Sequence, residues 1–471
     1  MIFRLMSKKQ LTIWIVLAAL VAGSFGYSLV NSVDFKKVGN DGKIHLTLAH
    51  WDNGGSTETD LVKVVCQKFM QKYPDVVVDV SIISSYEQQF NNFMASKNIP
   101  DVFCVPDGNF GRWVQTGVML DLQDYYNKST VIDKENIAPS ALKRYCWNGS
   151  TMGSGDLYCM PKDITPYVMY YNKDLFDKYN VPYPSKDVIM TPYEALEMWK
   201  KFGYDRNTVS TYKTGSKAGQ LKLAENHVYG IAKLYPEGLI WSNGADYLSE
   251  DRTEVLIDSP EFIEAFEYIQ ACQMDYAVAP RSALFSSTSE KTLFLNGDAA
   301  CYIEGRSVTT DLREKADFDW DIAPIPAFET NQQCNGWSGS VGYGVYINCE
   351  HKDEAFKLAE YFTSREGQLI MAEAGFTAPL YSDEQTLVNF YEIEKGKRPS
   401  NTDEFIRAAK NQRAGLWQYL PSVRWKEQLD KDSGAMFEDD PSLRLTPEQF
   451  LTDEKDKILN IIRNDFPELF E

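Results

Sequence analysis

A regular alternation of strand and helix patterns near the start of this 471-residue chain constrains its fold more than any other feature. Ile44 to His50 alternates like a strand, and Val76 to Ile83 and Val102 to Val105 are apolar runs of strand length. A helix pattern with an apolar stripe at three- and four-residue spacing follows the first strand and ends at Pro74. Strands joined by helices in this way pair in parallel, so the sequence predicts an α/β fold.

The same alternation recurs later, with strand patterns that include 167–171, 299–303 and 342–347. Thr191-Pro192-Tyr193-Glu194 is typical of a helix start, because Thr can cap, Pro suits the first turn and Glu completes a capping box. The segment after about residue 366 is expected to be mostly helical. A chain of this length exceeds one simple core, so we expect two domains or lobes.

Several of these strand patterns end in a ring or a charge beside a small, flexible residue. The groups are Trp51-Asp52, Tyr86-Glu87, Asp107-Gly108, Asp163, Trp241-Ser242-Asn243-Gly244, Glu304-Gly305-Arg306 and Trp337-Ser338-Gly339. Ligand sites in α/β folds lie at strand ends. Carboxylates beside aromatic rings suit a sugar, which offers hydroxyl groups and apolar ring faces. Each group taken singly is better explained by ordinary capping residues in a loop.

The charge and the motifs limit the other classes of function. The net charge of -19 argues against binding to nucleic acid or to an anionic membrane surface. The 4 His residues leave little room for a His-rich metal site, and the chain lacks the nucleophile-elbow, zinc-protease and phosphate-loop motifs. We therefore predict no catalytic residue, no metal and no cofactor. A glycosidase pair of carboxylates stays open, because sequence cannot show the separation that such a pair requires.

The N-terminus has the pattern of an export segment. Arg4, Lys8 and Lys9 precede the apolar run Leu11 to Val30, which is borderline in length for a membrane span. Residues 1–31 are therefore predicted to be either a cleaved signal peptide or a retained membrane anchor, and 32–43 a spacer. Either outcome places the rest of the chain outside the cytoplasm.

The 8 Cys residues of an exported chain raise the question of disulfides. Four of them are expected to be small core residues, because they fall in helix or strand patterns: Cys66, Cys104, Cys272 and Cys301. Cys146 and Cys159 flank a predicted hairpin and form the most plausible pair.

Six segments together resemble a known family. They are PDVFCVPDGNFGRWVQTGVMLDL, MPKDITPYVMYYNKDLFDKYNVPYP, TPYEALEMWKKF, WSNGADYL, LFLNGDAACYIEGRS and GWSGSVGYGVYINCEHKDEAFKLAEYFTSREGQLIMAEAGF. In this order they are similar to the extracellular sugar-binding proteins of ABC importers, the broad group that includes maltose-binding protein. The resemblance spans most of Ile44 to Pro379, and the C-terminal hundred residues match only loosely.

The resemblance implies a two-lobed, periplasmic-binding-protein-like α/β fold, with a hinge and a ligand cleft between the lobes. From the segment order, lobe one would comprise 44–161 plus 322–364, and lobe two 165–320 plus 366–471. The family's cleft positions carry over to these candidates: Trp51, Asp52, Glu87, Asp107, Asp163, Trp241, Asn243, Glu304, Arg306 and Trp337. Asp107 would accept hydrogen bonds from sugar hydroxyls, and Trp241 would be a stacking platform from lobe two. A core tryptophan is the alternative for Trp241.

Two departures from the family pattern stand out. The lipid-attachment Cys common in Gram-positive members is missing after the apolar run. Glu304-Gly305-Arg306 stands where the family often has a small residue and a tryptophan, and its two charges could simply form a salt bridge.

The expected function is a non-enzymatic receptor that captures a carbohydrate, an oligosaccharide in particular, and delivers it to the membrane permease subunits of an ABC transporter. We expect a monomer at the cell surface. A carbohydrate-active enzyme and a binding protein for a non-sugar solute, such as a peptide or polyamine, remain as alternatives.

Leu11 to Val30 should direct export of the whole chain, because a basic start followed by a long apolar run is the signal that export machinery reads. Fractionation of cells that express the full chain, followed by N-terminal sequencing, checks this. Recovery of the intact chain in the cytosol would contradict both the cleaved and the anchored form.

Overall fold

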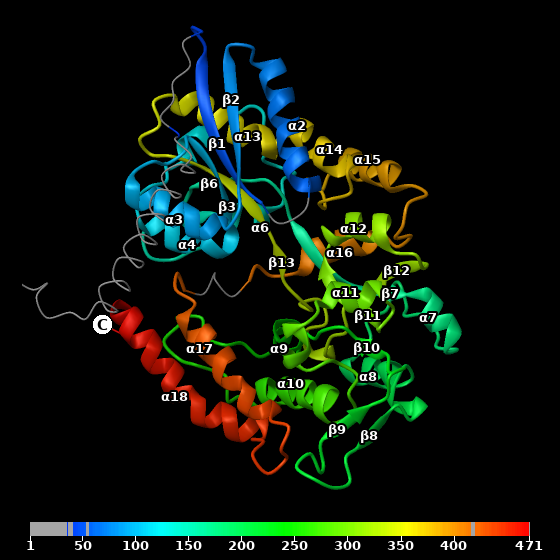
Figure 1. Ribbon diagram of the computed structural model, residues 1–471. Coiled ribbons are helices and arrows are strands. Elements are labelled where there is room, and N and C mark those ends of the chain that lie inside the picture. Colours follow the sequence, from blue (N-terminus) through cyan, green and yellow to red (C-terminus); the bar gives the residue numbers. More distant parts are fainter. Residues whose placement is uncertain (1–34, 36–40, 53–55, 416–419, 471) are drawn as a thin grey trace, which may run out of the picture.

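The computed structural model describes residue 35 and residues 41–52, 56–415 and 420–470. These residues form two lobes, and each lobe is built around its own β-sheet with helices on its sides (Figure 1). The predicted α/β class is thus confirmed. Residues 1–31, where the signal peptide or anchor is predicted, and most of the spacer lie outside the described residues. Within the described part, no helix combines the length and the apolar character required to cross a membrane.

Lobe one, in the upper half of Figure 1, contains a sheet in the order β2-β1-β3-β14-β6. Its strands are β1 (Ile44–Trp51), β2 (Val76–Ile83), β3 (Val102–Pro106), β6 (Cys159–Pro161) and β14 (Val341–Val345). The first three pair in parallel, as the alternation with helices predicts, whereas β14 runs antiparallel to both β3 and β6.

Helices and one hairpin complete lobe one. They are α2 (Ser56–Lys72), α3 (Tyr86–Ser96), α4 (Asp107–Gln115), α5 (Gln123–Lys128), α6 (Pro139–Lys143), the hairpin β4 (Cys146–Trp147) and β5 (Asp156–Leu157), α13 (Lys352–Thr363) and α14 (Arg365–Glu373), beside which lies α15 (Glu384–Glu394). The hairpin forms where it was predicted between Cys146 and Cys159.

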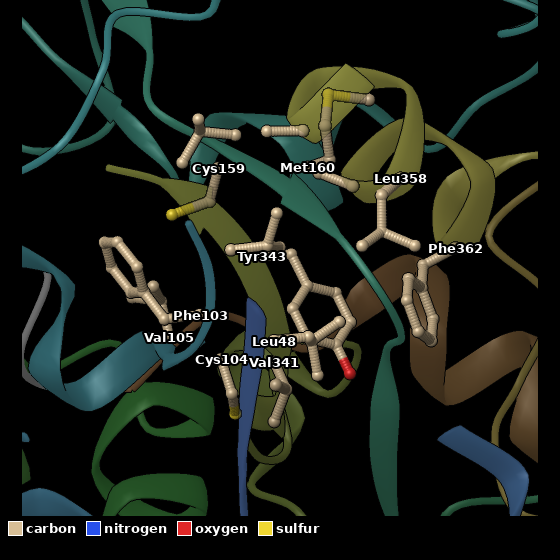
Figure 2. Packing of buried hydrophobic residues seen from close by; sticks show 14 of the residues in the cluster. Leu48, Phe103, Cys104, Val105, Cys159, Met160, Val341, Tyr343, Leu358 and Phe362 are labelled. Carbon is tan, nitrogen blue, oxygen red and sulfur yellow. The ribbon is translucent and has the colours of Figure 1, made fainter. Parts of the chain in front are cut away.

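The core of lobe one lies on both faces of its sheet, with α13 among the helices that cover it. Residues 102–105 are all fully buried, because β3 is a central strand covered on both faces. Figure 2 shows Tyr343 of β14 beside Phe362 of α13, and their ring centroids are 4.3 Å apart. Trp113, predicted to be a core residue, is fully buried in the same cluster.

Lobe two, in the lower half of Figure 1, contains a sheet in the order β10-β11-β7-β12, and β13 also pairs with β7. Its strands are β7 (Thr165–Asn172), β10 (Tyr229–Ile231), β11 (Ala299–Gly305), β12 (Trp320–Ala323) and β13 (Ser338–Gly339), with a separate hairpin of β8 (Val209–Thr211) and β9 (Leu221–Leu223).

The helices of lobe two are α7 (Lys173–Lys178), α8 (Pro192–Lys200), α9 (Pro236–Ser242), α10 (Pro260–Gln270), α11 (Glu290–Leu295), α12 (Val308–Lys315), α16 (Asp403–Asn411), α17 (Arg424–Asp432) and α18 (Pro447–Asp465). Some of them pack against this sheet, and others, such as α17 and α18, pack against each other, with α18 also packed against α10. A π-helical turn, Ala271–Asp275, continues α10, and 3₁₀ turns occur at Tyr204–Arg206, Ser282–Ser286, Glu329–Asn331, Ser433–Phe437 and Pro467–Phe470. The predicted capping box at Thr191 and Glu194 is present at the start of α8, and Trp199 of that helix is buried as predicted.

The chain passes between the lobes on neighbouring strands. It leaves lobe one at β6 and enters lobe two at β7 through residues 162–164, and it returns from β13 to β14 through Ser340. Figure 1 shows β13 between the two lobes. The chain passes between the lobes a third time after α14, on its way to α16, and there Ala378 forms a β-bridge with Ile164 of the first crossing.

Two of the predicted lobe boundaries need correction. The predicted return to lobe one at residue 322 falls inside β12, which pairs with β7 in the sheet of lobe two. Residues 366–373, predicted for lobe two, belong to α14, which packs against α2 and α13 of lobe one. Segment order does not show which sheet a strand joins, since neighbouring strands can come from distant parts of the chain.

The structure confirms the predicted core cysteines but not the disulfide considered. Cys66, Cys104, Cys272 and Cys301 are buried, as expected for small core residues. All eight thiols are free in the structure, so the pairing considered for Cys146 and Cys159 is not formed.

Gly230→Ala should destabilise lobe two. An added Cβ would lie 2.1 Å from Cβ and 2.6 Å from Cα of Trp199 in α8, and the backbone of a packed helix cannot yield easily. Overpacking of this kind costs about 1–3 kcal/mol or more, which a urea titration would measure as a lower midpoint. Gly434→Ala is the matched control, because nothing lies within 4 Å of its added Cβ. Equal midpoints for the two variants would contradict the packing described.

Candidate functional site

The candidate residues of lobe one gather at one edge of its sheet. Trp51 ends β1, Glu87 lies in the first turn of α3 after β2, and Asp107 lies in the first turn of α4 after β3. Because β1, β2 and β3 are parallel, their carboxyl ends meet at the same edge, which is where α/β sheets bind ligands. Asp52 directly follows Trp51, and its N–H donates to the carbonyl of Ile83 at the end of β2.

Asp107 is the most deeply placed of these carboxylates. It is buried, and its Oδ2 accepts a hydrogen bond from Nη1 of Arg144 at 3.0 Å. Burial raises the pKa of Asp107 to about 7, although the Arg144 guanidinium acts in the opposite direction. Its backbone N–H donates to the carbonyl of Ser340 at 3.1 Å, so this residue touches the strand that joins the lobes.

The other three residues of this edge face water more openly. Asp52 is exposed and accepts a hydrogen bond from Oγ of Ser84 at 3.2 Å. Glu87 is exposed and pairs with Arg112 of α4 at 2.7 Å. Trp51 is half-buried. Together with Asp107 they place carboxylates and a ring at this edge of the sheet, and their role in ligand binding stays a prediction.

Asp163 occupies a different position from the one expected of a ligand contact. It lies in the first crossing between the lobes, where Oδ1 accepts the N–H of Val341 at 2.8 Å and Oδ2 pairs with Lys162 at 2.7 Å. The residue is 2% exposed. Both carboxylate oxygens are therefore engaged in the hinge, which is a structural role that sequence position could not separate from ligand binding.

A buried chain of charges lies behind Asp163. Lys162, fully buried, also pairs with Oε1 of Glu58 in α2 at 2.6 Å, and His50 lies 3.3 Å from the same oxygen. Burial alone would raise the pKa of Glu58, but the Lys162 charge and the His50 contact outweigh it and hold that pKa well below its usual range. Burial lowers the pKa of His50, which favours the neutral imidazole.

Lobe two contributes a carboxylate among aromatic rings. Glu304, at the end of β11, accepts hydrogen bonds from the hydroxyl of Tyr302 at 3.1 Å and from the N–H of Gly305 at 2.8 Å, and burial raises its pKa. Nearby, Trp337 stacks on Tyr167 with ring centroids 4.6 Å apart, and Tyr235 meets Tyr167 edge-on at 5.6 Å. The rings of Tyr167, Tyr235 and Trp337 are half-buried.

These aromatic residues lie close to the hinge and to lobe one. Tyr167 comes two residues after the start of β7, and Trp337 directly precedes β13. Burial, then the charge of Glu304, and more weakly the charge of Asp107 raise the pKa of Tyr167, so the carboxylates of both lobes act on one hydroxyl. Tyr167 and Tyr235 were not among the predicted site residues. Tyr167 lies just after the predicted crossing, and Tyr235 directly precedes Pro236 at the start of α9.

Arg306 does not belong to this group. It is fully buried, its Nε donates to the carbonyl of Thr377, and its guanidinium pairs with Glu394 of α15 at 3.2 Å. The salt bridge considered between Glu304 and Arg306 is therefore not the one that forms, and the predicted ligand role of Arg306 is not supported by its position.

Trp241 and Asn243 also lie away from open surface. Trp241, on α9, is 1% exposed, its indole N–H donates to Asp246, and the guanidinium of Arg413 covers its ring at 4.5 Å. The expectation that Trp241 is a stacking platform is not supported by this position, and the alternative of a core tryptophan describes it. The Asn243 amide donates to the carbonyl of Glu261 and to Glu264, which joins the end of α9 to α10.

A pocket of about 770 Å³ opens between the lobes. Lobe one lines it with α6, Arg144 and residues 151–154 of the hairpin, and lobe two lines it with residues 246–256 and 412–414. Its volume lies within the range of sites for small molecules and short oligomers. Its lining includes four cationic side chains, Lys143, Arg144, Arg252 and Arg413, and two acidic ones, Asp246 and Glu250. In the part of the chain that the structure describes, no group of three or more His, Cys, Asp or Glu residues is placed to hold a metal ion.

Comparison with known proteins identifies the family. The sequence profile of the family described as "Bacterial extracellular solute-binding protein" matches residues 54–369. Because this match covers well over half of the chain, the chain belongs to that family, and the resemblance read from the sequence is confirmed.

Individual relatives agree with this assignment. The chain is 24% identical over 333 residues to the maltodextrin-binding protein MdxE of Bacillus subtilis, covering 68% of this chain and 70% of that protein. It is 23% identical over 406 residues to the sn-glycerol-3-phosphate-binding periplasmic protein UgpB of Rhizobium meliloti, covering 83% and 88%. The fold is similar to that of an ABC substrate-binding protein from Listeria monocytogenes solved in complex with cycloalternan, with a TM-score of 0.70, 24% identity, and 89% and 99% of the two chains covered.

Asp107→Asn should flatten the pH dependence of stability. Between about pH 4 and pH 7 the unfolded chain releases a proton that the folded chain keeps on Asp107, so the free energy of unfolding of the natural protein falls as the pH rises. The variant lacks this titration, and its loss of stability from pH 4 to pH 8 should be smaller by about 2–4 kcal/mol. Urea titrations across this range measure the difference. Identical pH profiles for the two proteins would show that the Asp107 pKa is not raised.

Proposed function

We propose that this protein is the extracellular receptor of an ABC importer, and that it captures a carbohydrate, an oligosaccharide in particular, between its lobes. Membrane permease subunits would then receive the ligand. Membership of the extracellular solute-binding family and the two-lobed fold support the receptor role. We further propose that the chain acts as a monomer at the cell surface and has no enzymatic activity, since the relatives named above are binding proteins.

The observation that carries the carbohydrate proposal is that each lobe places carboxylates beside partly exposed rings. Trp51, Asp52 and Asp107 of lobe one lie at the strand ends, and Glu304 with Trp337 lies next to the hinge in lobe two. Carboxylates accept hydrogen bonds from sugar hydroxyls, and rings pack against the C–H faces. The Asp107 charge acts on Tyr167 of lobe two, which supports a ligand held by both lobes at once.

A second candidate is a phosphorylated solute such as a glycerol phosphate. The observation in its favour is the inter-lobe pocket, whose lining has more cationic than acidic side chains although the whole chain carries -19 charges. Arg and Lys are the usual partners of phosphate groups. The similarity to the sn-glycerol-3-phosphate-binding protein of Rhizobium meliloti points the same way.

A thermal-shift screen of the chain from about residue 40 separates these candidates. A ligand that binds only the folded state at 100 times its Kd stabilises it by about 2.7 kcal/mol, so maltodextrins or galactooligosaccharides should raise the melting temperature. A shift with sn-glycerol 3-phosphate or glycerophosphocholine alone would favour the phosphorylated solute. Chromatography of the bound ligand after long incubation should recover it intact, and steady product formation would replace the receptor proposal by an enzyme.

Two tryptophans provide matched controls for any ligand found. Trp337→Ala should weaken binding roughly tenfold or more with a small effect on the melting temperature, because its ring is half-buried beside the hinge. Trp241→Ala should instead lower stability by about 3–5 kcal/mol, the usual cost of removing a buried large ring. The reverse pattern would remove Trp337 from the proposed site.

A further inference from the structure

Arg144 of lobe one binds a residue of each lobe through one guanidinium. It caps the C-terminal end of α6 in lobe one and is buried. Its Nη1 donates both to Oδ2 of Asp107 at 3.0 Å and to the carbonyl of Ser338 at 2.5 Å, and its Nη2 donates to Oγ of Ser338 at 2.5 Å. One guanidinium thus joins a carboxylate at the strand ends of lobe one to the hinge.

Ser338 belongs to lobe two. It starts β13, lies opposite Pro166 of β7, and its N–H donates to the carbonyl of Arg413 at 2.9 Å. Two residues later the chain has reached lobe one, where the carbonyl of Ser340 accepts the N–H of Asp107. Gly339, which has no side chain to restrict its backbone, is the only residue between these two attachments.

The planar guanidinium suits this position, because its nitrogens are fixed relative to one another and bind three acceptors in set directions. A rotation of β13 relative to lobe one must break at least one of the two bonds to Ser338. The same rotation also disturbs the ion pair between Arg144 and Asp107, because Nη1 donates to both Oδ2 of Asp107 and the carbonyl of Ser338. Arg144 also lines the inter-lobe pocket, so the contacts lie at the edge of the space that a ligand enters.

We propose that Arg144 is a positioning residue, which holds the angle between the lobes through Ser338 and couples that angle to the carboxylate of Asp107. Its hold on the hinge does not depend on which solute binds and goes beyond the proposed function. One consequence does rest on the proposed function: a solute that binds Asp107 changes the contacts between Arg144 and Ser338 in the hinge.

Tyr145, the next residue, offers a matched control. Its hydroxyl is a hydrogen-bond partner of Oγ of Ser340 at 3.1 Å and lies 3.4 Å from the carbonyl of Val105. Tyr145→Phe therefore removes a buried hinge hydrogen bond on the lobe-one side of Gly339 and leaves the contacts of Arg144 in place. It should lower the melting temperature without changing the arrangement of the lobes.

The test uses the ligand-free protein, so it does not depend on the identity of the solute. Arg144→Gln and Ser338→Ala should both change the radius of gyration in small-angle X-ray scattering and speed amide exchange at residues 338–341 roughly tenfold. Arg144→Lys should restore part of the protection, because an ammonium can still reach one acceptor. If Arg144→Gln does not fold, Ser338→Ala, which deletes only one contact, decides the hinge claim.

The coupling to Asp107 is tested by the double variant. If Arg144 links the two sites, the effects of Arg144→Gln and Asp107→Asn on exchange at residues 338–341 should not add, since both break the same connection. Unchanged scattering and hinge exchange in Arg144→Gln and Ser338→Ala would overturn the positioning role. Additive effects in the double variant would overturn the coupling. Failure of every sugar or phosphate in the thermal-shift screen would affect the proposed function only.

Discussion

The arrangement of the two lobes depends on a charge that is fully withdrawn from water. Lys162 sits at the first crossing with no exposed surface and is held between Glu58 and Asp163. An ammonium in such surroundings is tolerated only with partners of opposite charge in good geometry. Because Glu58 is fixed by α2 and Asp163 binds the N–H of Val341 on the returning strand, these contacts tie the first crossing and the return at β14 to lobe one.

The hinge that results is narrow and rigid at its lobe-one end. Ser340 is held by Tyr145, by the backbone of Asp107 and by the carbonyl of Asp163. On the lobe-two side, Ser338 is fixed by pairing with β7 and by Arg413. A rotation of the lobes thus involves the link at Gly339, the residues of the first crossing and the segment that leads from α14 and α15 to α16. A closure in which each lobe moves as a unit is the motion that such a connection allows.

Local patterns in the sequence predicted the elements well because each element satisfies its own propensities. The parallel strands of lobe one, the capping box at Thr191 and the burial of Trp113 all follow from residues close together in the chain.

The partners of buried side chains could not be predicted in this way, because they come from distant parts of the chain. Arg144 meets Asp107 at a separation of 37 residues and Ser338 at 194, and nothing in its own neighbourhood marks it. Asp107 and Asp163 look alike in sequence, yet the first lies at a strand end and the second inside a crossing. Trp241 and Trp337 likewise both precede a serine, and only packing distinguishes a covered ring from a half-exposed one.

The sheet of lobe one has a consequence for how the chain is made. Its fourth strand, β14, lies between β3 and β6 and comes from residues 341–345, whereas β3 ends at residue 106. At a synthesis rate of about 5–20 residues per second, roughly 10–50 s pass before β3 meets its missing neighbour. During that interval the nascent lobe has an unfilled position in the middle of its sheet and cannot complete its core. A polypeptide that crosses a membrane in an extended form benefits from this delay, because the order of its strands keeps lobe one from folding before export.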